Sequence, residues 1–236
     1  MKKEIKSYIV FTTRAYRLIL FVLMPLAVIG IQLGLSVMCR HLEEWKGDIE
    51  DIVYVADLAM AVASSLIMAA EVHADNWVFG GVAAKTGASP EFPKSSTRGR
   101  QMMWGALRID SIRQILESAL LLVLGRVCWT VAAGGFSELF APGGLAFMAA
   151  VLFCECFTVT VALSVVRRYD NYHVNMSIAW LACFILVWLL ILCRMYSYVM
   201  CVVMALFYVS ASVLGQRMTM KRVEESYYDQ KPETWN

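Results

Sequence analysis

The sequence predicts an all-α, polytopic membrane protein with six transmembrane helices and an interfacial amphipathic helix before the first of them. Hydrophobic residues make up 59% of the 236 residues and charged residues only 17%, whereas soluble domains are nearer half apolar and a quarter charged. Backbone groups in lipid must be satisfied within a helix or a closed barrel. The alternating pattern of barrel strands is absent, so we expect helices.

Six apolar runs have about the 20 residues that a helix needs to cross the roughly 30 Å apolar core of a bilayer. They are residues 18–38, 52–72, 112–133, 145–166, 176–193 and 198–214. The first run is too long for the core of a signal peptide, and no small-x-small cleavage site follows it. We therefore expect it to be retained as the first span.

Lys and Arg are distributed unevenly around these runs. If the N-terminus is cytoplasmic, the cytoplasmic segments hold 17 of the 21 Lys and Arg residues, and the outer loops hold Arg40, Lys46 and Arg194. Such a bias is the usual sign of orientation in membrane proteins. It predicts a multi-pass protein of the plasma membrane with both termini in the cytoplasm, and it leaves no excess of basic residues to indicate nucleic-acid binding.

Residues 1–17 form a segment of their own before the transmembrane region, which we place at 18–214. Ile5, Tyr8 and Tyr16 share one helical face, while Lys6 and Arg17 lie opposite. This pattern predicts a helix in the inner membrane interface, with its apolar side toward the lipid. The alternative is a basic flank that only fixes orientation. Residues 215–236 are predicted to be a polar cytoplasmic tail.

The longest predicted connection is residues 73–110, on the cytoplasmic side. A centre rich in Gly, Ser and Pro leads into a basic segment, where Ser96 or Thr97 is a suitable cap for a new helix. Long ordered loops usually have a function. This connection is therefore a candidate docking surface for a cytoplasmic partner.

Four charged residues fall within the predicted spans: Asp57, Glu117, Arg126 and Glu155. Such residues are costly in lipid and usually face the bundle interior, a cavity or a partner charge. Arg126 lies at a depth that allows pairing with Asp57 or Glu155, and Glu117 is four residues after Arg113. Three interpretations remain open: structural ion pairs, the lining of a polar pathway, and a proton relay.

Motifs for enzymatic chemistry are absent from the sequence. It contains no HExxH pattern for zinc and no GxSxG nucleophile elbow. Residues 80–86 differ from a phosphate-binding loop because Ala84 replaces the glycine required directly before Lys85. The sequence therefore predicts no catalytic, cofactor-binding or metal site in this chain.

The layout resembles the membrane (permease) subunit of a type-2 ABC exporter, of the small peptide- or drug-exporter kind. The segment from Lys94 to Gly105 carries the resemblance best, because a Ser/Thr stretch and Arg98 lead a helix back toward the membrane. The resemblance implies that residues 1–17 are the connecting helix. It also implies a coupling helix within 73–105 that binds a soluble ABC ATPase through Lys94, Arg98, Arg100 and Trp104.

The resemblance further implies a complex in which ATP and Mg are bound by the partner ATPase and not by this chain. A second membrane subunit, most simply a second copy in a homodimer, would complete the pathway. The cargo would be amphipathic or antimicrobial peptides, lipids or drugs. Only residues 194–197 separate the last two spans, so the re-entrant outer helices common in that family would be either reduced here or built from residues 192–206.

Two alternatives follow from the residues alone. An ion-coupled secondary transporter would use the intramembrane charges and would need no ATPase. An accessory or immunity membrane protein would carry out no transport of its own. An intramembrane enzyme is disfavoured by the missing catalytic motifs.

Overall fold

The computed structural model describes residues 2–41, 49–75, 97–133, 140, 142–168, 172–193 and 198–228. All of its elements are helices, with no strand among these residues. They are α1 (Lys2–Phe11), α2 (Arg14–Leu18), the π-helical turn η1 (Ile19–Leu23), α3 (Met24–His41), α4 (Ile49–Asp75), α7 (Thr97–Ala133), α8 (Pro142–Val166), α9 (Tyr172–Cys193) and α10 (Tyr198–Tyr228).

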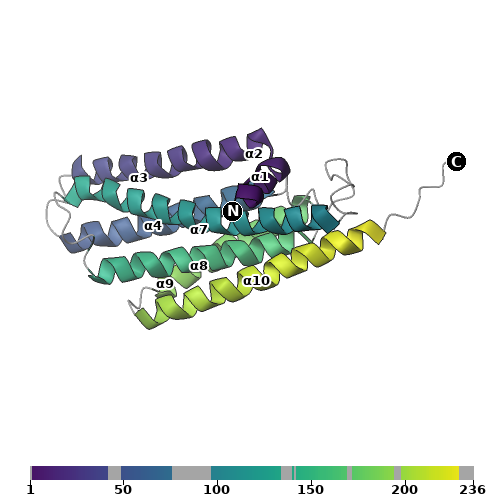
Figure 1. Ribbon diagram of the computed structural model, residues 1–236. Helices are drawn as coiled ribbons and strands as arrows, with labels where there is room; N and C mark the ends of the chain where they lie inside the picture. The colour runs from purple at the N-terminus through teal and green to yellow at the C-terminus, as the bar shows by residue number, and fades with distance from the viewer. Residues whose placement is uncertain are drawn as a thin grey trace.

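The long helices form a single bundle in which successive helices alternate in direction, so that α4, α8 and α10 run parallel to one another (Figure 1). α4 and α8 form its interior, since 50% and 61% of their apolar segments are buried, against 22% for Arg14–His41 and 17% for Tyr198–Arg222. The N-terminal helices and the C-terminal end of α10 lie at the same end of the bundle (Figure 1). α4 also ends there, and α7 begins there (Figure 1).

Four helical segments are long and apolar enough to cross a membrane: Arg14–His41, Ile52–Asp75, Pro142–Val166 and Tyr198–Arg222. The other two expected spans are helices as well. α7 has 37 residues but carries several charges along its length, and the apolar part of α9, His173–Leu189, is shorter.

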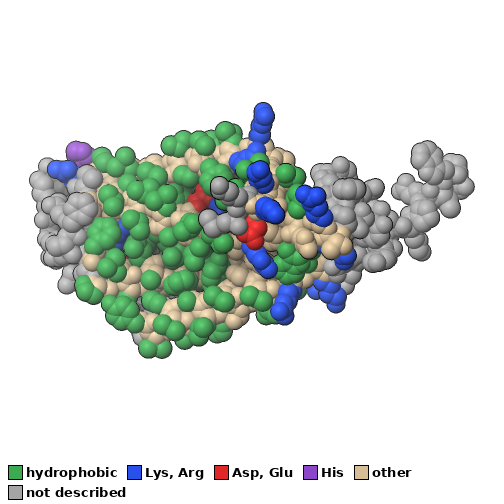
Figure 2. Space-filling view, viewed as in Figure 1, with side chains coloured by type: hydrophobic (Ala, Val, Ile, Leu, Met, Phe, Trp, Pro, Cys, Tyr) green, Lys and Arg blue, Asp and Glu red, His purple; other side chains and the backbone are tan. Residues whose placement is uncertain are grey.

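Large apolar side chains cover much of the outside of the bundle (Figure 2). On α3, α9 and α10 the exposed ones include Leu26, Leu33, Met38, Trp180, Phe184, Trp188, Val202, Leu206 and Phe207. Exposed apolar surface of this extent is typical of a face that contacts lipid or another protein. The structure therefore describes a membrane-embedded helical protein.

The connection expected at 73–110 is shorter in the structure. α4 continues through Asp75 and α7 begins at Thr97, so residues 97–110 belong to a helix. The apolar run begins only near Ile112, so hydropathy alone does not mark where this helix begins. Lys94 and the rest of 76–96 lie outside the described residues.

The single helix expected over residues 1–17 is instead two helices joined by a turn. The hydroxyl Oγ1 of Thr13 accepts the backbone N–H of Tyr16 at 3.1 Å and so caps α2. The guanidinium of Arg17 donates to the carbonyl oxygens of Ile9 and Thr12, each at 3.0 Å. Both helix ends at the turn thus have partners for groups that would otherwise be unsatisfied.

α1 packs against the first half of α7. Tyr8 and Phe11 are buried there, and burial raises the pKa of the Tyr8 hydroxyl. Gly105 allows the close approach, since a Cβ at this position would lie 3.2 Å from Cγ of Glu4. Ile9 remains 51% exposed. α1 therefore has one face on the bundle and a second apolar face left uncovered.

Candidate functional site

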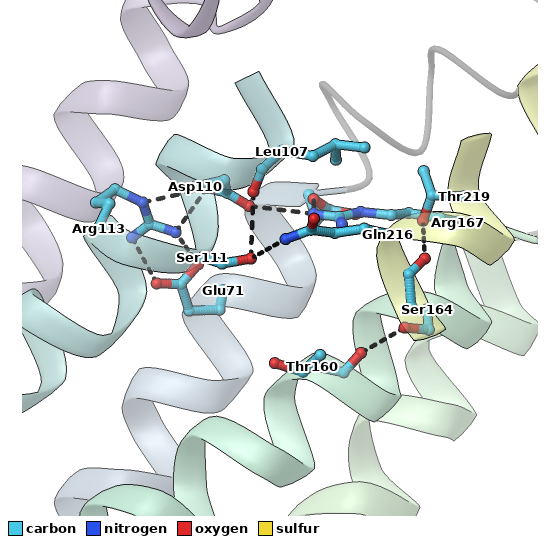
Figure 3. A network of polar contacts seen from close by, with 12 residues as sticks. Glu71, Leu107, Asp110, Ser111, Arg113, Thr160, Ser164, Arg167, Gln216 and Thr219 are labelled. Carbon is cyan, nitrogen blue, oxygen red and sulfur yellow. Dashed lines mark hydrogen bonds and ion pairs between the residues drawn. The ribbon is translucent and has the colours of Figure 1, made fainter. Parts of the chain in front are cut away.

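A network of buried charges joins α4, α7 and α8 toward the end of the bundle that holds α1 (Figure 3). It contains two guanidinium groups and four carboxylates: Arg113, Arg167, Glu71, Asp75, Asp110 and Glu117. The spacing within each helix explains part of the assembly, because residues three or four apart share a helical face. Glu71 and Asp75 are one turn apart in α4, and Asp110, Arg113 and Glu117 follow the same spacing in α7.

Arg113 is the centre of the network. Its Nη1 and Nη2 atoms donate to the two carboxylate oxygens of Glu71, both at 2.6 Å. Nη1 also donates to Oε2 of Glu117 at 2.7 Å, and Nη2 donates to Oδ1 of Asp110 at 3.0 Å. The planar guanidinium suits this two-pronged contact. Arg113 thereby ties α4 to α7.

Arg167, directly after α8, extends the network. Its Nε and Nη2 atoms donate to the two oxygens of Asp75 at 3.0 and 2.8 Å, and Nη2 also donates to Oδ2 of Asp110 at 3.1 Å. Burial by itself would lower the pKa of Arg167, but the charges of Asp75 and Asp110 outweigh it and raise that pKa. Asp110 thus binds both arginines, and it accepts a further bond from the hydroxyl of Tyr16 at 3.1 Å.

A second charged pair lies farther along the same helices. Arg126 of α7 donates to Oδ1 of Asp57 at 2.6 Å, and their side chains are 1% and 7% exposed. Beside this pair, Gln32 of α3 donates to the carbonyl oxygen of Ala59 and accepts from the indole of Trp129, each at 2.7 Å. Of the two partners that depth allows for Arg126, the structure therefore selects Asp57.

Glu155 lies in the middle of α8 and is fully buried. The hydroxyl of Ser118 donates to its Oε1 atom at 2.6 Å. Its other oxygen, Oε2, has no hydrogen-bond partner among the described residues, and no ion pair to Glu155 is found in that part of the chain. Of the four intramembrane charges expected from the sequence, Asp57, Arg126 and Glu117 are ion-paired. Glu155 instead accepts a hydrogen bond from Ser118.

Three of the four residues expected to dock an ATPase lie on the first turns of α7. Arg98 and Arg100 are exposed, and Trp104 is half-buried against the apolar cluster that holds Tyr8. The fourth, Lys94, is outside the described residues. The α7 members of the buried network, Asp110, Arg113 and Glu117, follow on the same helix a few turns further into the bundle.

The count of basic residues in the predicted cytoplasmic segments includes Arg113 and Arg167, and the structure buries both of them. Their side chains are 5% and 8% exposed, and each is ion-paired. The sequence does hold a signal for the carboxylates: Glu71 and Asp75 are one turn apart at the end of an apolar run. The sequence holds no signal that Asp75 contacts Arg167, because the two residues lie 92 positions apart along the chain.

The described residues contain no group of three or more His, Cys, Asp or Glu side chains placed to hold a metal ion. Comparison with known proteins identifies no relatives: no family model, no curated protein and no solved structure matches this chain. Its function must therefore be argued from the bundle and its charges.

Proposed function

We propose that this chain is the membrane subunit of an ATP-driven exporter of the type-2 ABC kind, working with a separate soluble ATPase and a second membrane subunit. The observation that carries the proposal is the bridge made by Asp110, which binds both Arg113 and Arg167. Through this bridge α4 and α7, the helices on either side of residues 76–96, are tied to α8.

Such a bridge is what a coupled transporter needs. Movement of a docked ATPase must reach the helices around the pathway, and it enters through the segment between Asp75 and Arg98. Removing one partner of a buried ion pair costs about 3–5 kcal/mol because the other charge is left uncompensated. A displacement at this end therefore moves α4, α7 and α8 together instead of bending one helix alone.

The surface at this end suits an acidic partner. Exposed basic residues gather there (Figure 2). They are Lys3, Lys6, Arg14, Arg98, Arg100, Arg108, Arg168, Arg217 and Lys221. Complementary charge steers association and fixes the register of two proteins. Arg98 and Arg100 begin the helix that enters the bundle, so a partner bound to them acts directly on α7.

The substrate class we propose is an amphipathic or antimicrobial peptide, with lipids or drugs as alternatives. At the other end of the bundle the connections 42–48, 134–141 and 194–197 are short. These connections are too short to form a large domain over the pathway. An uncovered pathway suits a substrate that leaves directly from the membrane. A second copy would supply the other wall of the pathway and cover part of the exposed apolar surface.

Charge reversal at the proposed docking helix tests the function. In the double variant Arg98→Glu, Arg100→Glu, we expect the ATPase to be lost from the purified complex because the contact becomes repulsive. The control is Arg40→Glu, which reverses the charge of an exposed arginine at the opposite end of the bundle and should retain the ATPase. Both variants should elute as one folded species. Equal retention of the ATPase by the two would contradict the proposed interface.

A further inference from the structure

Small polar side chains line the contact between α7, α8 and α10 (Figure 3). We call this line the polar seam and define it by Ser111, Gln114, Ser118, Thr160, Ser164, Ser212, Gln216 and Thr219. Gln216 donates to the hydroxyl of Ser111 at 3.0 Å across the seam. Gly215 lets the helices meet closely, because a Cβ there would overlap the Ser164 hydroxyl.

Two cavities lie along the polar seam. The outer one, about 190 Å³, opens at the charged end between α8 and α10 and is lined by Ser164, Arg167 and Lys221 among others. The inner one, about 10 Å³, shares Ser164 and Arg167 with it and also borders Gln114. A space of roughly 10–15 Å³ holds one water molecule if polar groups face it. The Nε2 atom of Gln114 is buried with no hydrogen-bond partner among the described residues, so water there would satisfy it.

Neither Ser118 nor Glu155 lines the inner cavity, but Gln114, which does, lies on the same face of α7 as Ser118. Gln114 lies one helical turn before Ser118, whose hydroxyl donates to Oε1 of Glu155 at 2.6 Å. Along α8, Glu155 lies nine residues from Ser164, which is about 13 Å at 1.5 Å per residue. The polar seam therefore ends at a buried carboxyl group whose Oε2 atom has no hydrogen-bond partner within the described part of the chain.

No Lys, Arg or His of the described residues forms an ion pair with Glu155. α4 contributes the hydroxyl of Ser64 and the negative charge of Glu71, and α7 contributes Ser118. Cys156, the next residue in α8, lies nearby. The guanidinium of Arg113 is already held by Glu71, Asp110 and Glu117. An ionised carboxylate buried without a partner costs far more than the neutral acid.

We propose that Glu155 is a proton-binding site in the middle of the membrane, reached by water through the polar seam from the charged end of the bundle. The proton comes from water in the seam and returns to it, so the carboxyl exchanges with one side of the membrane. A proton fits better than a metal ion, since no metal-holding group of side chains exists among the described residues. The site does not depend on the ATPase proposed above.

Infrared difference spectroscopy of the full chain in vesicles tests the site. Stepping the pH from acidic to alkaline should remove a C=O stretching band of a protonated carboxyl group, and transfer to D₂O should shift that band. Glu155→Gln should abolish the band, because the amide keeps the shape but binds no proton. Glu117→Gln is the matched control and should leave the band in place. A band that survives in Glu155→Gln would overturn the proposal.

Cysteine labelling tests the water path separately. In a chain whose seven native cysteines are replaced, Gln114→Cys should react with a small charged thiol reagent added from the side of the charged end and not from the other side. Leu116 is two residues away, and its side chain is 64% exposed on the apolar outer face of the bundle. Leu116→Cys should therefore face lipid and stay unreactive from both sides. A Gln114 cysteine that is unreactive, or reactive from the opposite side, would overturn the path. Neither test uses the ATPase. A failure of the ATPase proposal therefore leaves the expected results of both tests unchanged.

Discussion

The two arginines of the buried network differ in the number of carboxylates that each one holds. Arg113 contacts Glu71, Asp110 and Glu117, whereas Arg167 contacts Asp75 and Asp110. Because Asp110 serves both, its loss would leave each arginine with fewer partners at once. Charges inside a membrane are tolerated when they are paired in this way, and the network shows that pairing across three helices.

The pair of Arg126 and Asp57, whose side chains are 1% and 7% exposed, gives a test of a buried ion pair. Asp57→Asn or Arg126→Gln should each lower the free energy of unfolding by about 3–5 kcal/mol, because one buried charge is left uncompensated. The double variant should lose much less than the sum, since no charge remains. Denaturant unfolding in detergent measures all four proteins. Losses that simply add would show that the two side chains do not interact.

At the scale of elements, the close contact between α8 and α10 is the feature most sensitive to volume. Gly215 faces Ser164, whose hydroxyl is already bonded to the carbonyl oxygen of Thr160 at 2.7 Å. A larger residue at position 215 must displace that hydroxyl or push the helices apart. The same contact walls the polar seam, so its geometry affects the proton path as well.

Alanine substitutions at two glycines separate volume from helix propensity. Gly215→Ala should lower the free energy of unfolding by about 1–3 kcal/mol through overpacking. Gly34→Ala, in α3, has nothing within 4 Å of its added Cβ and should be neutral or gain up to about 1 kcal/mol from helix propensity. Thermal unfolding in detergent compares the two. Equal effects would mean that α8 and α10 do not meet closely at Gly215.

The elements themselves could be predicted from the sequence, because the length of a membrane-crossing helix imposes a long apolar run that is visible in composition alone. A helix is found over each of the six runs. The start of α7 at Thr97 could also be predicted, from Ser96 or Thr97 as a helix cap. The apolar run alone would place this start near Ile112, because the first turns of α7 pack against α1 through Tyr8 and Phe11.

The candidate site was only partly predictable. The pair of Arg113 and Glu117 is visible as a one-turn spacing, and the structure contains it. The links from Arg113 to Glu71 and from Arg167 to Asp75 join residues 42 and 92 positions apart. Such contacts depend on which helices pack together, and a single sequence carries no periodic signal for that.

The whole molecule is organised by charge along its long axis. One end carries most of the exposed Lys and Arg, the surface beside it is apolar, and α1 and the end of α10 both lie at the basic end (Figures 1 and 2). In a cell membrane the basic end is expected to face the cytoplasm. The buried network lies just inside that end, between the proposed docking helix and the polar seam. This placement connects the two proposals without making either depend on the other.

The central claim is that a soluble ATPase works at the basic end of this bundle. The most direct measurement is affinity purification of the intact chain from the membranes of its native host, followed by identification of what comes with it. We predict a stoichiometric soluble ATPase whose rate of ATP hydrolysis rises on association. A well-folded preparation with no nucleotide-binding partner would contradict the claim and would favour an ion-coupled transporter or an accessory membrane protein.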